Sequence, residues 1–195
     1  MAPESALILA SLKKYGLLLQ TDAILPSVCA LVTGAPVRGS WWAHPRGQDI
    51  FRVNSDLEDH PDVLVTKLIS GKITYLDRAL WPAVIAVGRA REPWQMDHLS
   101  RQARDLLAEV DHKPVQPERH LSKAAAELEI KLLAYSEQFH TDDGAHARRL
   151  ESWNHWSKRT GFAEKRMTAA RAKILLETAV ADLNQKFNGR GKLPW

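Results

Sequence analysis

Apolar and polar positions along one short stretch of the chain follow the pattern of a β-hairpin. Val63–Ile69 and Lys72–Asp77 are β-rich segments, and only Ser70-Gly71 separates them. A two-residue connection of this kind favours a tight turn, because glycine readily adopts the positive φ that matches strand twist. We expect the last residue of the first segment to pair with the first residue of the second. One face is then apolar, and the other carries Lys67 and Lys72.

Apolar residues at helical spacing predict three helices before this hairpin. The first covers about residues 3–19, a short second helix lies between Pro26 and Gly34, and the third covers about residues 45–57. Because an isolated hairpin is only marginally stable in water, we expect it to pack on these helices. Helices and a hairpin in this order are typical of a winged helix-turn-helix, whose third helix enters a DNA groove while the hairpin contacts the backbone.

A proline pair interrupts the helical pattern of the second half of the chain. The break lies between Pro114 and Pro117, and three helices are predicted after it, at about residues 118–140, 145–159 and 162–187. We expect the last residues, from Asn188, to form a basic tail without fixed order. The predicted fold is therefore mainly α with one β-hairpin. It consists of a winged helix-turn-helix-like module over residues 1–113 and a C-terminal three-helix unit over residues 118–195.

Positive charge gathers at the end of the chain. Residues 145–195 contain 11 Lys and Arg against 4 Asp and Glu, whereas residues 1–144 contain 16 against 19. The formal net charge of +4 therefore comes from the C-terminal quarter. A basic strip of this kind attracts nucleic acid, because each neutralised phosphate releases counterions. The alternative is that these side chains form the solvated faces of amphipathic helices.

The turn before the third predicted helix has an unusual composition. Arg38 to Gly47 reads RGSWWAHPRG, in which Trp41 and Trp42 are flanked by arginines, glycines and His44. Adjacent positions cannot both point into a core from one face, so we expect at least one indole to be exposed. An exposed aromatic beside arginines suits stacking on an unpaired base or insertion into a duplex. The alternative is a Trp pair that closes one end of a small helical core.

Together these features favour a DNA-binding protein that uses the hairpin, the Trp-rich turn and the basic C-terminal helices. The expected partner is duplex, damaged or single-stranded DNA, and phosphate contacts would position the protein without reading sequence. The candidate nucleic-acid-binding residues are Arg38, Trp41, Trp42, His44, Arg46, Arg52, Lys67, Lys72, Arg148, Arg149, Lys158, Arg159 and Arg166. A protein-interaction module, with the Trp-rich turn as a hydrophobic anchor, is an alternative.

An enzyme that acts on damaged DNA, a DNA glycosylase or an abasic-site lyase, is the alternative from a different class. The Trp pair would then open the duplex, and the extruded nucleotide would occupy a pocket. Lys67 or Lys72 would attack C1′ of the sugar as an amine, which requires a neutral amine at working pH. Asp62 is the candidate carboxylate for activating water. The sequence leaves open whether the protein is an enzyme.

Acidic residues and histidines cluster around one predicted turn. Glu137 and His140 are three positions apart, which would place them on one helix face, and Asp142, Asp143 and His146 follow. The sequence has no His-Glu-x-x-His or Cys-x-x-Cys pattern, no phosphate-binding Gly-rich loop and no dinucleotide fingerprint. We therefore expect a solvated helix end rather than a metal centre, and no cofactor.

Composition restricts the remaining classes. A chain of 195 residues with 45% hydrophobic residues can bury one good core or two small ones. Its single cysteine, Cys29, lies in an apolar run and excludes an internal disulfide. No stretch reaches the roughly 18 consecutive apolar residues of a membrane span, and the start lacks a signal-peptide pattern. We therefore expect a cytoplasmic protein without membrane association.

Several short blocks resemble a family of bacterial proteins without an assigned activity. The blocks are Gly39–Pro45 (GSWWAHP), Asp59–Val63 (DHPDV), Leu80–Pro82 (LWP) and Arg91–Trp94 (REPW), and the resemblance covers most of the chain. It implies no catalytic residue. By element order alone the chain also resembles winged-helix proteins, and some enzymes that excise damaged bases are built from winged helices.

Overall fold

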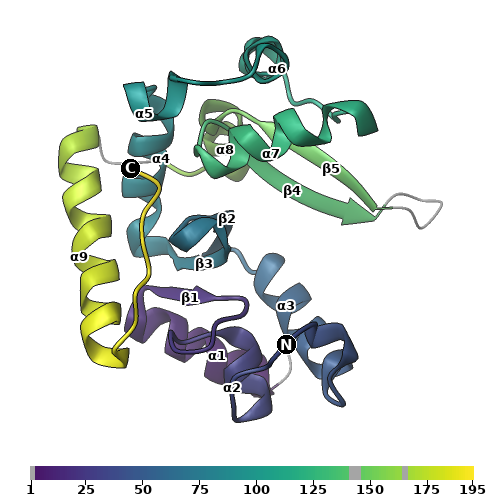
Figure 1. The fold of residues 1–195 in the computed structure, drawn as a ribbon, viewed down its shortest axis with the longest axis vertical. Helices are drawn as coiled ribbons and strands as arrows, with labels where there is room; N and C mark the ends of the chain where they lie inside the picture. The colour runs from purple at the N-terminus through teal and green to yellow at the C-terminus, as the bar shows by residue number, and fades with distance from the viewer. Residues whose placement is uncertain (1–2, 141–145, 164–166) are drawn as a thin grey trace. The chain divides into compact units, whose positions relative to one another are not determined.

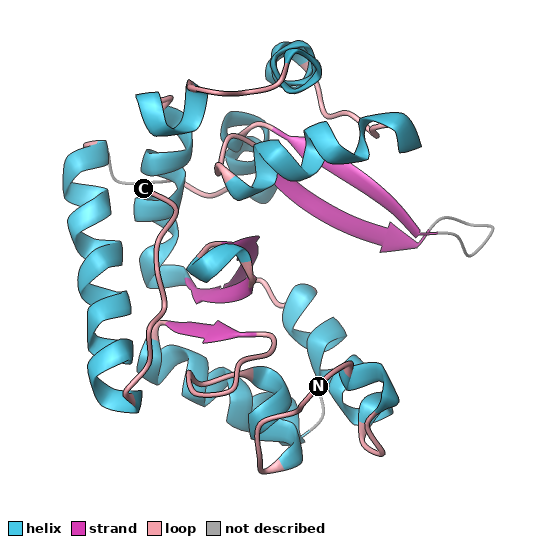
Figure 2. Ribbon diagram, in the orientation of Figure 1, coloured by secondary structure: helices cyan, strands magenta, loops and turns pink. Residues whose placement is uncertain are grey.

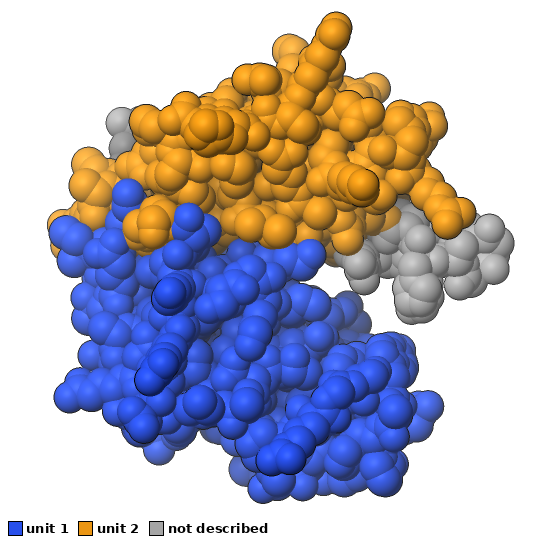
Figure 3. Space-filling model, in the orientation of Figure 1, with its two compact units in different colours: residues 1–81, 173–194 blue, residues 82–172, 195 orange. Residues whose placement is uncertain are grey.

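The computed structural model describes residues 3–140, 146–163 and 167–195. The chain forms two compact units (Figure 3): unit 1 contains residues 1–81 and 173–194, and unit 2 contains residues 82–172 and 195. Helices predominate, and the described residues also form two small antiparallel sheets (Figure 2). The predicted mainly α class is confirmed. The sequence predicts one β-hairpin, whereas the described residues form two. Within the described residues, no helix combines the length and the apolar character needed to cross a bilayer.

Unit 1 begins with the predicted order of three helices and a hairpin (Figure 1). One short strand lies between the first two helices, and one long C-terminal helix joins the unit from Lys173 onward. The elements are α1 (Pro3–Tyr15), β1 (Leu17–Leu19), α2 (Val28–Thr33), η1 (Trp41–Ala43), α3 (Gly47–Glu58), β2 (Val63–Lys67), η2 (Ile69–Gly71), β3 (Ile73–Asp77), η3 (Arg78–Leu80) and α9 (Ala169–Phe187).

The first helix ends earlier than predicted, at Tyr15. Gly16 ends it because this glycine adopts a left-handed conformation (φ 75°) and donates its N–H to the Leu12 carbonyl (2.7 Å). The apolar residues that follow form β1, which pairs antiparallel with β3 and places Leu18 opposite Tyr75. The sheet therefore has the order β1-β3-β2, so that β3 lies between β1 and β2.

The hairpin forms, but its register differs by one residue from the prediction. Lys67 pairs with Ile73 and Val65 with Tyr75, because Leu68–Lys72 make a wider connection than a two-residue turn. A slip of one residue moves every side chain of a strand to the opposite face. Lys67 therefore shares a face with Val65 and Tyr75, and the predicted face with both lysines is not formed.

Both faces of this sheet are buried. One face packs on the helical core of unit 1, which includes Ile8, Ile50 and Tyr75. On the opposite face, Thr74 and Leu76 are fully buried. The hairpin therefore packs on the upstream helices as predicted, but it has no open cationic side.

The C-terminal segment of unit 1, residues 188–194, has a fixed course, so the predicted disordered tail is wrong. Asn188 ends α9 with a left-handed φ of 53°. The Asn184 side chain then accepts the Gly191 N–H (2.7 Å) and donates to the Gly191 carbonyl (2.9 Å). Ser70 donates its N–H to the Lys192 carbonyl (2.7 Å), so this segment runs back along α9 to the tip of the hairpin (Figure 1).

Unit 2 contains a second hairpin, which the sequence does not predict. β4 pairs antiparallel with β5, with Glu137 opposite Arg149, and Leu128 and Leu150 belong to the core of the unit. From Pro82 onward, the elements of the unit are α4 (Trp81–Ala90), α5 (Pro93–Met96), α6 (Arg101–His112), η4 (Arg119–Leu121), α7 (Ser122–Ile130), β4 (Tyr135–His140), β5 (His146–Glu151) and α8 (Trp153–Thr160).

The predicted C-terminal three-helix unit is therefore wrong, because the helix expected at residues 118–140 stops at Ile130. Leu132 adopts a left-handed φ of 55°, and Leu133 donates its N–H to the Leu128 carbonyl (2.8 Å). This hydrogen bond is that of a Schellman cap, a position that glycine usually occupies. Because leucine rather than glycine occupies this position, the sequence does not indicate that the helix ends here.

The predicted division of the chain at residues 114–117 also falls inside unit 2. Val115 and Leu150 exchange two backbone hydrogen bonds of 2.8 Å, which join this segment to the edge of β5. Helices α6 and α7, on either side of the proline pair, pack into the same core. The prolines therefore mark a connection within a unit rather than a boundary between two units.

Candidate nucleic-acid interface

The Trp-rich turn forms an aromatic stack at the start of α3. The Trp41 and Trp42 rings are stacked, with centroids 4.1 Å apart, and the Trp42 and Phe51 rings are tilted, with centroids 5.4 Å apart. Trp41 packs on the core of unit 1, whereas Trp42 is 58% exposed and Phe51 is 39% exposed. The expectation that one of the two indoles is exposed is confirmed.

Close packing against the helix holds this turn in place. A Cβ on Gly47 would lie 3.1 Å from the Trp42 carbonyl and 3.2 Å from the Trp41 carbonyl, so the turn approaches α3 closely. His44 Nδ1 accepts the backbone N–H of Arg46 (3.1 Å), and the His44 carbonyl accepts the N–H of Gly47 (2.7 Å). His44 is therefore part of the turn that positions the tryptophans.

Two of the predicted phosphate contacts in this region are already neutralised. Arg46 pairs with Glu4 and with Asp49 (2.9 Å), and Arg52 pairs with Asp49 (2.8 Å) and Glu4 (3.6 Å). The hydrogen bond from Arg46 lowers the pKa of Asp49, and the hydrogen bond to Glu4 raises the pKa of Arg46. Arg38 is exposed and makes no ion pair with any described residue. The aromatic stack is therefore the more distinctive feature of this surface.

The candidate catalytic residues do not converge. Asp62 lies beside the first residue pair of the hairpin and binds Arg78 (2.8 Å). Lys67 and Lys72 lie at the other end of the hairpin, and Lys72 binds Asp22 (2.7 Å). Burial opposes ionisation of Asp22, but the hydrogen bonds from Lys72 and two backbone amides prevail and lower its pKa. Asp62 and Lys72 are thus held in separate ion pairs.

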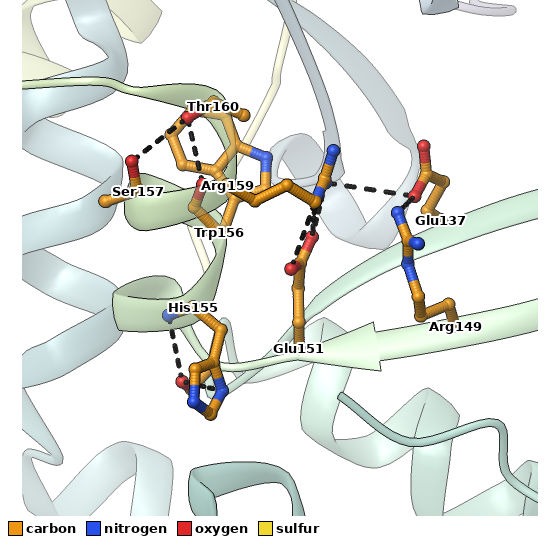
Figure 4. Close-up of polar contacts among 9 residues, drawn as sticks. Glu137, Arg149, Glu151, His155, Trp156, Ser157, Arg159 and Thr160 are labelled. Atoms are coloured by element: carbon orange, nitrogen blue, oxygen red, sulfur yellow. Dashed lines mark hydrogen bonds and ion pairs between the residues drawn. The ribbon is translucent and has the colours of Figure 1, made fainter. Parts of the chain in front are cut away.

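Two of the basic residues predicted in the C-terminal quarter, Arg149 and Arg159, lie in a salt-bridge network of unit 2 (Figure 4). Arg159 binds both carboxylate oxygens of the buried Glu151, with Nε 3.0 and 3.2 Å away, and approaches Glu137 at 3.8 Å. Arg149 also donates to Glu137. The hydrogen bond to Glu151 raises the pKa of Arg159. This network joins β4, β5 and α8, so these two arginines hold the hairpin to the helix.

The remaining predicted contacts of this quarter divide into three cases. Arg148 lies 3.9 Å from Glu129, a largely buried carboxylate. Lys158 is exposed on α8. Arg166 lies outside the described residues. Of this predicted track, only Lys158 is both described and open to a phosphate without competition from a carboxylate.

The predicted sharing of a helix face by Glu137 and His140 is wrong, because both residues lie on strand β4. Asp142 and Asp143 lie outside the described residues, and the described part of the chain holds no group of three or more potential metal ligands.

Phe51 is the member of the aromatic surface that sequence reasoning misses. Ile50, Val53 and Leu57 form the buried stripe of α3. Phe51 lies next to Ile50 and outside this stripe, which is the signal that it faces solvent. Helical spacing alone could therefore have added Phe51 to the Trp-rich turn.

No family model, no curated protein and no solved structure matches this chain. The geometry of the two units therefore carries the functional argument. Its most distinctive element is a rigid, solvent-exposed aromatic pair, Trp42 and Phe51, beside a polar helix face that includes Gln48 and Arg52. Such a surface can stack on flat partners or cover an apolar patch.

Proposed function

We propose that unit 1 is a nucleic-acid-binding module whose contact surface is the exposed aromatic pair Trp42 and Phe51 with the neighbouring face of α3. The observation that carries this proposal is the exposure of Trp42, which is 58% accessible although its ring contacts both Trp41 and Phe51. A large aromatic side chain held open in this way is available for a ligand at little entropic cost.

The element order supports this proposal. In unit 1 the order is α1-β1-α2-α3-β2-β3, and the antiparallel sheet has the order β1-β3-β2. This order agrees with a winged helix-turn-helix, in which the third helix is the DNA-contacting one. Gln48 and Arg52 lie on the exposed part of α3, and side chains of these types form hydrogen bonds to bases and phosphates.

The charge balance of this surface favours DNA with unpaired or unstacked bases over regular duplex. Arg46 and Arg52 are matched by Glu4 and Asp49, so few phosphate contacts are available without breaking an ion pair. Stacking of an aromatic ring on a base contributes about 1–3 kcal/mol per base and does not depend on sequence. We therefore expect base stacking to supply most of the affinity at this surface.

A binding titration tests the proposal. Fluorescence anisotropy with labelled single-stranded, gapped and duplex DNA is expected to show the weakest binding to duplex. Trp42→Ala and Phe51→Ala should each weaken binding by about 5- to 160-fold, the equivalent of one lost stacking contact. Ile174→Ala is the matched control, because Ile174 is an equally exposed apolar residue (61%) on α9 of the same unit.

The proposal fails if the wild-type protein binds no DNA more tightly than about 10⁻⁴ M at low salt. It also fails if Trp42→Ala and Ile174→Ala bind alike. Tight binding to a protein partner that is lost in Trp42→Ala, without affinity for nucleic acid, would instead identify an interaction module. No contact within the described residues favours the repair-enzyme alternative, because Asp62 and Lys72 occupy separate ion pairs.

A further inference from the structure

Two ammonium groups of unit 1 converge on one aromatic ring. Lys14, at the end of α1, places its Nζ 5.3 Å from the Tyr15 ring centroid, and Lys186, at the end of α9, places its Nζ 4.8 Å from the same centroid. Phe187 packs edge-on against Tyr15, with centroids 5.3 Å apart, and so fixes the two helix ends together. The two ammonium groups are at most about 10 Å apart, which is about one Debye length at 0.1 M salt.

No carboxylate among the described residues compensates these charges. Lys13, Lys14, Lys186, Arg190 and Lys192 are all exposed, and none forms an ion pair with a described residue. Cations near a helix C-terminus interact favourably with the helix dipole, which accounts for each lysine singly. The dipole does not account for two ammonium groups on one ring, since like charges repel.

The C-terminal segment adds two further charges at defined positions. Arg190 lies between Asn188, which turns the chain at the end of α9, and Gly191, which the Asn184 side chain holds by two hydrogen bonds. The backbone of Lys192 is fixed to Ser70 by hydrogen bonds of 2.7 and 3.2 Å. Chain connectivity keeps Arg190 within about 15 Å of Lys186, since each residue spans at most about 3.6 Å.

We propose that Lys13, Lys14, Lys186, Arg190 and Lys192 form a phosphate-binding surface, the basic surface, that contacts the backbone of the nucleic acid bound by unit 1. This inference rests on the proposed function and extends it. The aromatic pair supplies base stacking but Arg46 and Arg52 beside it are neutralised, whereas the basic surface has charge without a partner. A chain of phosphodiesters fits it because each contact releases a condensed counterion and the sites need no fixed base sequence.

The salt dependence of binding is the test. Lys186→Gln with Arg190→Gln removes two charges of the basic surface. The control, Arg104→Gln with Lys123→Gln, removes two exposed charges of unit 2 that also pair with no described residue. Both variants change the net charge equally, so long-range attraction falls equally. The slope of log K against log salt should decrease by about 1.4–1.8 in the first variant, at 0.7–0.9 per lost phosphate contact, and stay unchanged in the control.

A second variant tests the geometry without changing charge. Asn184→Ala removes both hydrogen bonds to Gly191 and should loosen the segment that positions Arg190 and Lys192. We expect this variant to weaken DNA binding and to reduce the salt slope, while circular dichroism confirms that the helices remain folded.

The outcomes separate this inference from the proposed function. If Trp42→Ala weakens binding but the Lys186 and Arg190 variant behaves like its control, the basic surface is refuted and the aromatic site stands. If the salt slope falls but Trp42→Ala has no effect, the aromatic site fails alone. Binding to vesicles of equimolar phosphatidylserine and phosphatidylcholine, lost in the basic variant and without DNA affinity, would assign the surface to a membrane and overturn the inference.

Discussion

Gly88 on α4 lies directly against the indole of Trp153 on α8. A Cβ built on Gly88 would lie 2.1 Å from Trp153 Nε1 and 2.8 Å from the Leu132 carbonyl, which accepts the hydrogen bond of that Nε1 (2.7 Å). Helices α4 and α8 and the left-handed turn at Leu132 thus meet at one glycine. The absence of a side chain there is a packing requirement.

Gly88→Ala is therefore expected to destabilise the protein, although alanine normally favours a helix by about 0.5–1 kcal/mol over glycine. Overpacking of a filled core typically costs about 1–3 kcal/mol. Chemical denaturation followed by circular dichroism measures the change in the free energy of unfolding. The same substitution in a Trp153→Phe background should cost less, because the smaller ring leaves room. An unchanged or increased stability in Gly88→Ala would contradict this packing.

The two arginines of the salt-bridge network, Arg159 and Arg149, should contribute unequally to the free energy of unfolding. Arg159→Met leaves Glu151, which is only 1% exposed, as a buried charge without its main partner, and breaking such a pair costs about 3 kcal/mol. Arg149→Met should cost about 1 kcal/mol or less, because Arg149 and Glu137 are both about one-third exposed. Denaturant titrations compare the two variants. The double variant Arg159→Met with Glu151→Met should recover most of the loss; equal costs for the two single variants would argue against this assignment.

Acid should remove the contribution of Asp22. Its folded-state pKa lies below the ordinary value of 3.8, because the hydrogen bonds from Lys72, Ile24 and Leu25 outweigh burial. A lowered carboxyl pKa stabilises the fold above pH 3.8, and this stability is lost as the pH falls through the folded-state pKa. Asp22→Asn should therefore be less stable than wild type at neutral pH, by about 1–2 kcal/mol for a charged hydrogen bond.

The difference between wild type and Asp22→Asn should close as the pH falls below 3.8. Asp62→Asn is the control, since Asp62 and Arg78 are both more than half exposed and such pairs contribute little. Stability curves from neutral pH down to the acid transition measure both differences. A stability difference between wild type and Asp22→Asn that stays constant with pH would contradict the role of Lys72.

Alkali should weaken the fold through Cys29. Burial raises the pKa of this thiol from 9.0 to about 11, so the folded protein retains a proton that the unfolded chain releases. The free energy of unfolding is therefore expected to fall as the pH rises from 9 to 11. Cys29→Ala leaves a small cavity and is therefore less stable at neutral pH, but this variant has no thiol that could ionise. The stability gap between wild type and Cys29→Ala should narrow over this pH range, and a parallel pair of curves would be inconsistent with the buried thiol.

Elements whose signals are local agree well between sequence and structure. The three helices before the hairpin follow from apolar spacing and from the glycine at the end of the second helix. The exposed indole follows from two adjacent tryptophans, because neighbouring positions cannot share one buried face. In each case the deciding contacts lie within a few residues of one another.

The hairpins show where such local signals are insufficient. In the first hairpin, the alternation of residues along the strands is visible in the sequence. The five-residue connection at Leu68–Lys72 shifts the pairing by one residue and so places Lys67 on the other face of the sheet. In the second, Leu132 occupies the position after the helix end where glycine is usual, so the sequence predicts a helix at the residues that form β4. A left-handed leucine is tolerated only because the surrounding structure holds it there.

The sequence by itself determined the mainly helical class, the first hairpin and the exposure of the Trp-rich turn, since these depend on neighbouring residues. Only the tertiary structure decided which cations are open to a ligand. Arg46 is neutralised by Glu4, 42 residues away, and Lys72 by Asp22, 50 residues away. Ser70 fixes Lys192 across 122 residues. Charge neutralisation depends on distance in space, and the sequence carries no local record of it.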